Sequence, residues 1–167
     1  WSEWAGVMIK ELAAGDVAVE YLIEEALRYD VKAMTFEPDS PVIAGTTSDI
    51  ADVLLPVLSN WTHKQLMDHL NEHAARVTMA PAVPLRPLLE RLRREGFILG
   101  VATNAGEFEA TSHLTSAGIA DLFDLVIGFD SGHGSKPEPG MCIAFAEHFD
   151  LEPSRVAMIG DSLHDLR

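Results

Sequence analysis

The second half of the chain alternates short apolar runs with helical stretches, and this alternation limits the possible folds more than any other feature. The apolar runs cover residues 97–102, 125–127 and 156–159, each the length of a strand that is buried on both faces. The segments before and between them carry helical patterns. Strands that alternate with helices pair in parallel through right-handed crossovers. The sequence therefore predicts an α/β fold with a parallel sheet over residues 80–167.

The first half of the chain has a different pattern. Apolar residues recur at helical spacing from Val19 to Leu27, with Asp16 as the predicted N-cap. A capping box over residues 62–65 opens a further helix. The proline-rich segment 80–84 then has the composition of a linker. We expect residues 1–79 to form a mostly helical unit that is distinct from the sheet.

The charge balance restricts the partners of the protein. The chain carries 26 acidic and 12 basic side chains, for a net charge of −14. Such a surface repels nucleic acid and anionic membranes, so we exclude both as partners. A small anionic substrate would need a local positive site, which a divalent metal and a suitably placed lysine supply.

Cysteine content and hydropathy suggest a compartment. Cys142 is the sole cysteine, which excludes an internal disulfide and suits a reducing environment. No apolar run reaches the roughly 18 residues of a membrane span, and no secretory signal pattern is present. We expect a cytoplasmic protein, either a monomer or a homodimer.

Polar residues follow each of the three predicted strands. Thr103 and Asn104 follow the first, Lys136 lies in the loop after the second, and Asp161 and Asp165 follow the third. In open parallel sheets, ligands bind beyond the carboxyl ends of the strands. A hydroxyl group, a lysine and two carboxylates that converge there would suit a phosphoryl group bound beside Mg²⁺.

Each of these residues also has an ordinary structural interpretation. Asp161 and Asp165 could be an N-cap and a first-turn acid of a helix. Thr103 could cap the next helix, and Asn104 could simply favour a turn. Lys136 could be a solvated surface lysine, whose truncation would change the free energy of unfolding by no more than about 0.5 kcal/mol.

Three segments together resemble the haloacid-dehalogenase superfamily, in its phosphoglycolate-phosphatase-like branch. ILGVATNA at 98–105, SKPEPGM at 135–141 and RVAMIGDSLHD at 155–165 resemble its second, third and fourth motifs, in that order. The resemblance implies a Rossmann-like core with a parallel sheet, and a helical cap formed by the first half. It implies Mg²⁺ ligation by Asp161 and Asp165, with Thr103, Asn104 and Lys136 at the catalytic site.

The resemblance also implies a mechanism whose nucleophile is not in this sequence. The family's first motif is an Asp-x-Asp strand, and no residue here matches it. Its first aspartate would form an aspartyl-phosphate with a small phosphorylated metabolite, such as a 2-phosphoglycolate-like compound. Its strand would lie between the strands predicted at 98–102 and 156–159, so we expect the sequence to lack residues of a longer molecule at both ends.

Two alternatives stay open at this point. A haloacid dehalogenase of the same fold would need no metal, whereas the paired acids Asp161 and Asp165 favour metal chemistry. A non-catalytic binding or regulatory fragment would be consistent with the missing nucleophile. The residues that precede Trp1 in the encoded protein would distinguish these possibilities.

Overall fold

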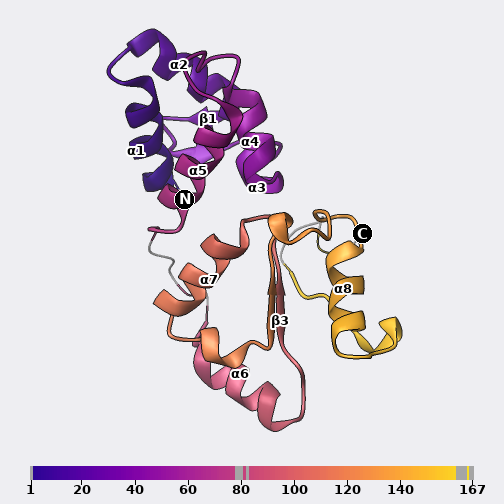
Figure 1. Ribbon diagram of the computed structural model, residues 1–167. Coiled ribbons are helices and arrows are strands. Elements are labelled where there is room, and N and C mark those ends of the chain that lie inside the picture. The colour runs from indigo at the N-terminus through magenta and orange to yellow at the C-terminus, as the bar shows by residue number, and fades with distance from the viewer. Residues whose placement is uncertain (1, 78–80, 82, 161–164, 166–167) are drawn as a thin grey trace. The chain divides into compact units, whose positions relative to one another are not determined.

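The chain divides into two compact units, residues 1–77 and 78–167 (Figure 1). The structure is a computed structural model, and it describes residues 2–77, 81, 83–160 and 165. The first unit is mostly helical, and the second contains a parallel strand pair.

The first unit is built from five helices and one short hairpin among the described residues. Its elements are α1 (Ser2–Ala13), α2 (Val17–Leu27), β1 (Tyr29–Asp30), β2 (Thr35–Phe36), α3 (Pro41–Ala44), α4 (Thr47–Leu54) and α5 (His63–Ala74). The predicted caps are confirmed: the Asp16 carboxylate accepts hydrogen bonds from the Ala18 and Val19 amides, and Thr62 and Gln65 form a capping box. These local bonds satisfy amides that would otherwise have no partner at a helix start.

The helices of the first unit surround one apolar core. Met8 and Ile9 of α1, Ile23 of α2, and Leu66 and Leu70 of α5 are all buried within it. These positions follow helical spacing, so each helix turns one apolar stripe inward. This apolar core holds α1, α2 and α5 together.

The β1–β2 hairpin was not predicted. Its strands pair antiparallel, with Tyr29 opposite Phe36 and Asp30 opposite Thr35. Arg28 ends α2 in a left-handed conformation, and its guanidinium forms an ion pair with Asp39 beyond the hairpin. Two-residue strands carry too few side chains to show a period of two, so hydrophobic periodicity could not reveal them.

The second unit contains the parallel sheet. Its elements are α6 (Leu85–Arg94), β3 (Gly100–Ala102), α7 (Glu107–Ser116), η1 (Ala120–Leu122), β4 (Leu125–Ile127), η2 (Phe129–Ser131), α8 (Gly140–His148) and η3 (Pro153–Arg155). Strands β3 and β4 pair in parallel, with Val101 opposite Val126, and α7 is the crossover between them. The predicted βαβ connection is therefore confirmed.

Close packing around the sheet depends on two glycines. A Cβ atom at Gly100 would lie 2.5 Å from the Phe145 ring, so α8 packs directly on the backbone of β3. A Cβ atom at Gly128 would lie 2.3 Å from the Glu107 amide nitrogen. Gly128 therefore lets the end of β4 approach the start of α7, which draws the two strand-end loops together.

The strand predicted at 156–159 is wrong for the described residues. Val156 has an extended backbone, with φ −101° and ψ 132°, but residues 156–159 pair with no described strand. Ile159 is 87% exposed. An apolar run can predict an extended segment, but a strand also requires a neighbour to which it can hydrogen-bond. The additional strand expected between this segment and β3 stays a prediction.

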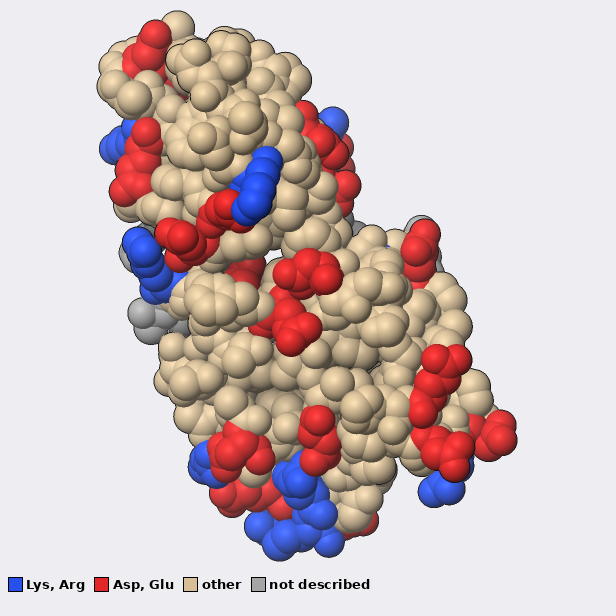
Figure 2. Space-filling view, in the orientation of Figure 1, with Lys and Arg blue, Asp and Glu red and all other residues tan. Residues whose placement is uncertain are grey.

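On the face drawn in Figure 2, acidic side chains lie on both units, and several basic side chains gather where α6 lies. Two of these arginines hold α6 against the segment before β4: Arg86 pairs with Asp121 at 2.5 Å and Arg93 pairs with Asp124 at 2.6 Å. These basic side chains are thus partly neutralised within the unit. None of the described helices has both the length and the hydropathy needed to cross a membrane.

Candidate active site

Thr103 lies immediately after β3, at the carboxyl end of the parallel pair. Its amide donates to the Ile127 carbonyl at 3.0 Å, which extends the ladder with β4 by one bond. Its Oγ1 accepts a hydrogen bond from the Ala105 amide at 3.1 Å. The hydroxyl does not cap α7, whose N-cap is Gly106. Since Oγ1 accepts from the backbone, its own proton stays available for donation to a ligand oxygen.

Asn104 joins the loop after β3 to the loop that carries Lys136. Its Oδ1 accepts from the Lys136 amide at 2.7 Å, and its Nδ2 donates to the Lys136 carbonyl at 3.0 Å. This pair of bonds fixes both backbone polar groups of Lys136, which precedes a cis peptide bond to Pro137. Asn104 therefore connects two loops that are 32 residues apart in the sequence. The interpretation that it only favours a local turn does not explain these two bonds.

Lys136 and Asp165 form an ion pair in this region. Lys136 Nζ lies 2.6 Å from Asp165 Oδ1, and the two side chains are only 19% and 4% exposed, respectively. The interpretation of Lys136 as a solvated surface lysine is therefore wrong. Asp165 also lies close to the backbone of Gly160. A Cβ atom at position 160 would fall 2.2 Å from the Cγ atom of Asp165, so this position has room only for glycine.

The structure thus brings together three of the five predicted site residues. Asn104, Lys136 and Asp165 are linked by hydrogen bonds and an ion pair, and Thr103 directly precedes Asn104 in the chain. Asp161 lies outside the described residues. The carboxylate of Asp165 offers the hard oxygen donors that Mg²⁺ prefers, so this position fits a divalent ion in its donor chemistry.

Glu109 is a buried acid of this unit that the sequence did not reveal. It lies in α7 and is 4% exposed. Burial is the main cause that raises the pKa of Glu109, to about 7, while a hydrogen bond from the Gly106 backbone opposes the shift and the charge of Asp130 adds to it. A glutamate in the first turn of a helix is ordinarily exposed and interacts favourably with the helix dipole. The residue pattern therefore did not predict that Glu109 is buried.

We expect Glu109→Gln to stabilise the protein above neutral pH. Below about pH 4.5 the carboxyl group is protonated in both the folded and unfolded states. Between about pH 4.5 and 7 the unfolded state releases its proton while the folded state retains it, so the parent loses stability as pH rises, by about 3 kcal/mol in total. The neutral glutamine avoids this loss.

Urea unfolding of parent and variant at pH 5 and pH 8 measures the effect. The variant should gain stability relative to the parent at pH 8 and much less at pH 5. Glu147→Gln, at an exposed position of α8, controls for the substitution itself. An equal difference between parent and Glu109→Gln at both pH values would contradict the assignment of a raised pKa.

A shallow hollow of about 400 Å³ lies in the first unit. It is lined by Asn60, Trp61, Gln65, Asp68, His69 and Glu72. None of these belongs to the three motifs, and the hollow has no lysine or arginine in its lining to receive a phosphoryl group. The motif residues therefore remain the better candidates for phosphate chemistry.

Comparison with known families agrees with this arrangement of motifs. The sequence matches the family described as "Haloacid dehalogenase-like hydrolase" over residues 15–167. The chain belongs to this family. The match to the haloacid dehalogenase-like hydrolases includes most of the helical unit as well as the sheet, so it extends over both units. The prediction of an α/β core of this superfamily with a helical cap is confirmed.

Relatives within the family carry phosphatase names. A phosphoglycolate phosphatase of Nitrosospira multiformis is 28% identical over 172 residues, which cover 96% of this chain and 67% of the relative. One from Nitrosococcus oceani is 36% identical over 46% of this chain and 34% of its own length. An N-acetylmuramic acid 6-phosphate phosphatase of Pseudomonas aeruginosa is 30% identical over 62% of this chain and 45% of its length. The matches thus span one third to two thirds of these relatives.

Two solved structures share the fold. A predicted phosphoglycolate phosphatase from Haemophilus somnus superposes with a TM-score of 0.63 at 21% identity, covering 88% of this chain and 71% of that protein. A phosphatase from Thermococcus onnurineus superposes with a TM-score of 0.57 at 24% identity, covering 94% and 67%. The predicted membership in the phosphoglycolate-phosphatase-like branch agrees with these relatives and with the family match.

Proposed function

We propose that the intact protein is a Mg²⁺-dependent phosphatase that hydrolyses a small phosphorylated metabolite resembling 2-phosphoglycolate. The observation that carries this proposal is the partly buried Lys136–Asp165 pair, with Nζ and Oδ1 2.6 Å apart. Asn104 holds the Lys136 backbone, so residues from three separate motifs meet beside the end of β3. The phosphatase names of the relatives support the same reaction class.

In this mechanism Lys136 supplies the positive charge that an acidic protein otherwise lacks. Its ammonium would contact a phosphoryl oxygen and offset the neighbouring carboxylates, including Asp165. The Thr103 hydroxyl would donate a second hydrogen bond to the phosphoryl group. Asn104 would act as a positioning residue, because its two bonds hold the backbone from which the lysine extends.

Asp161 and Asp165 would hold Mg²⁺, with Asp165 ligating either directly or through a water molecule. When bound, the ion would neutralise negative charge on the phosphoryl oxygens. The Oδ1 atom of Asp165 accepts from Lys136, so the carboxylate would connect the lysine to the metal position. That shared carboxylate is the reason to expect the lysine and the metal to act on one phosphoryl group.

The covalent steps require two carboxylates of the family's first motif, which this sequence does not contain. The first would attack phosphorus and form an aspartyl-phosphate as the substrate alkoxide leaves. The second would protonate that alkoxide and then take a proton from the water that hydrolyses the intermediate. Residues 1–77 would act as the cap that excludes bulk water and selects the substrate.

Substrate assays on the intact protein test the reaction class. We expect phosphate release from 2-phosphoglycolate with a kcat/KM about tenfold or more above that for a bulky sugar phosphate, because a closing cap selects by size. A haloacid should release no halide. Halide release without phosphate release would favour the dehalogenase alternative, and inactivity towards all these compounds would favour a non-catalytic role. The cytoplasmic location and the monomeric or dimeric state stay predictions.

A further inference from the structure

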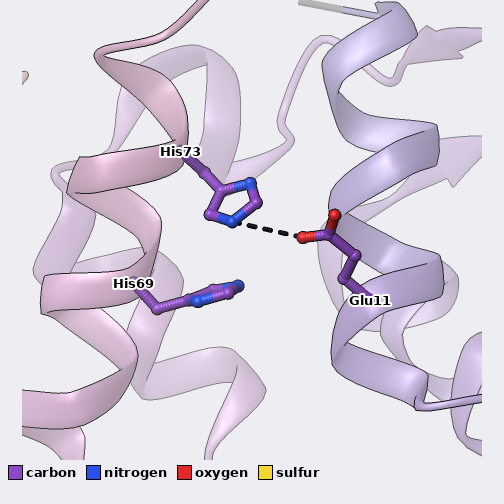
Figure 3. A group of neighbouring side chains, drawn as sticks. All are labelled: Glu11, His69 and His73. Atoms are coloured by element: carbon purple, nitrogen blue, oxygen red, sulfur yellow. Dashed lines mark ion pairs between the residues drawn. The ribbon is translucent and has the colours of Figure 1, made fainter.

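A second cluster of ligand-type side chains lies in the first unit, and nothing in the proposed phosphatase reaction uses it. Glu11 of α1 and His69 and His73 of α5 place their ligand atoms within 4.8 Å of one another (Figure 3). The two histidines are four residues apart, so their rings leave the same face of α5, one turn apart. Figure 3 shows both rings directed toward the helix that carries Glu11.

Two of the three candidate ligand side chains, Glu11 and His73, already contact each other. His73 Nε2 lies 3.1 Å from Glu11 Oε2, and the His73 side chain is 20% exposed. In a tetrahedral zinc site with metal–nitrogen distances of about 2.0–2.1 Å, neighbouring ligand atoms lie roughly 3.3 Å apart. The Glu11–His73 distance therefore already matches the spacing that one ion would impose.

The third side chain, His69, gives separate evidence for a binding site. Its Nε2 atom is buried and has no hydrogen-bonding partner among the described residues. A buried imidazole nitrogen without a partner is costly, and such groups call for an explanation. The His69 and His73 ring centroids are 4.3 Å apart, so both imidazoles lie close enough to contact one ion.

We propose that Glu11, His69 and His73 bind a divalent transition-metal ion, with zinc as the best match, and that this ion joins α1 to α5. Two imidazoles and one carboxylate are a ligand set that suits zinc, whereas Mg²⁺ prefers oxygen ligands alone. Three protein ligands leave a fourth position for water. The ion would give His69 Nε2 its partner and would bridge two helices that the apolar core already holds together.

Zinc binding to the intact protein tests this site. The protein is stripped with a chelator and titrated with Zn²⁺ against a chromophoric competitor, in excess Mg²⁺ so that oxygen-only sites are filled. The parent should bind one equivalent that His69→Ala and His73→Ala each weaken by about 100-fold or more, since even indirect changes at metal sites cost 10–100-fold. Zinc at a concentration about 100 times its Kd should also raise the parent's Tm by on the order of 5 °C.

His63→Ala is the matched control. His63 lies on the same helix and also faces a carboxylate, with Nε2 3.3 Å from Asp52 Oδ1, yet it belongs to no cluster of three ligand residues within the described part of the chain. This variant should keep the zinc equivalent. Glu11→Gln changes a half-exposed side chain and keeps its size, so it tests the site even if a histidine variant fails to fold.

The absorption spectrum of the Co²⁺-substituted parent gives a measurement that needs no variant, because tetrahedral nitrogen and oxygen ligation produces strong visible bands. Absence of zinc binding in the parent would overturn the proposal and leave an ordinary ion pair beside a buried histidine. Equal zinc affinity in the parent and in the His69, His73 and Glu11 variants would overturn it as well. Both outcomes are measured by zinc binding and do not depend on phosphatase activity. A failure of the zinc-site proposal can therefore be distinguished from a failure of the proposed function.

Discussion

Replacing Lys136 with alanine is expected to lower the rate of phosphate release by about 10²–10³, because one preorganised charge contact to the transferring group is lost. The ammonium lies 2.6 Å from the Asp165 carboxylate, in a region where the lysine is only 19% exposed. Limited solvent access makes such a contact stronger than a surface pair. Lys136→Arg should restore little activity, because a planar guanidinium does not replace a compact ammonium held at one point.

The same substitution should also destabilise the protein, by about 1–3 kcal/mol rather than the 0.5 kcal/mol or less expected for a solvated lysine. The reason is that the Asp165 carboxylate, at 4% exposed, would lose its ion pair with Lys136. A double variant, Lys136→Ala with Asp165→Asn, removes the carboxylate charge as well and should recover part of the stability without recovering turnover. Melting temperature and turnover are measured together on each variant, and near-parent turnover in Lys136→Ala would refute the assigned role.

Asp161→Asn is expected to reduce turnover at least as strongly, by weakening Mg²⁺ binding. An amide oxygen carries no charge and is a poorer ligand for a hard dication than a carboxylate oxygen. The apparent Mg²⁺ affinity should fall about tenfold or more, so that excess Mg²⁺ restores part of the lost rate. Rates across a Mg²⁺ titration separate this loss of metal from a direct loss of chemistry.

Asp150→Asn provides the control for removing one negative charge from the same unit. Asp150 is exposed, and its left-handed backbone, with φ 52°, is a conformation that asparagine tolerates. Its turnover and Mg²⁺ dependence should match the parent. If Asp161→Asn also retained the parent's rate and Mg²⁺ dependence, the metal assignment would be wrong.

Local signals in the sequence predicted the parts of the fold that depend on local interactions. The Asp16 cap and the Thr62–Gln65 capping box need only residues within three positions of one another, and both are present. The β3–α7–β4 crossover also followed from the alternation of short apolar runs with helices. Elements whose stability depends on a distant neighbour were less predictable, as residues 156–159 show.

In the candidate site, too, the sequence predicted features that depend on local patterns and missed those that depend on distant contacts. Motif order identified Thr103, Asn104 and Lys136 as catalytic-site candidates, but it did not reveal that Asn104 holds the backbone of Lys136. Its two hydrogen bonds to the Lys136 backbone cross 32 residues, and no local pattern encodes such a contact. Burial of Glu109 was missed for the same reason, since it results from how α7 packs rather than from its own sequence.

The most direct test of the account is phosphate release from 2-phosphoglycolate by the intact protein, measured first with a chelator and then across increasing Mg²⁺. The account predicts no release in the chelator and a rate that rises with Mg²⁺ to saturation, because the acidic residues that approach the phosphoryl group need a cation between them. Equal release with and without Mg²⁺, or none at any Mg²⁺ concentration, would contradict a Mg²⁺-dependent phosphatase.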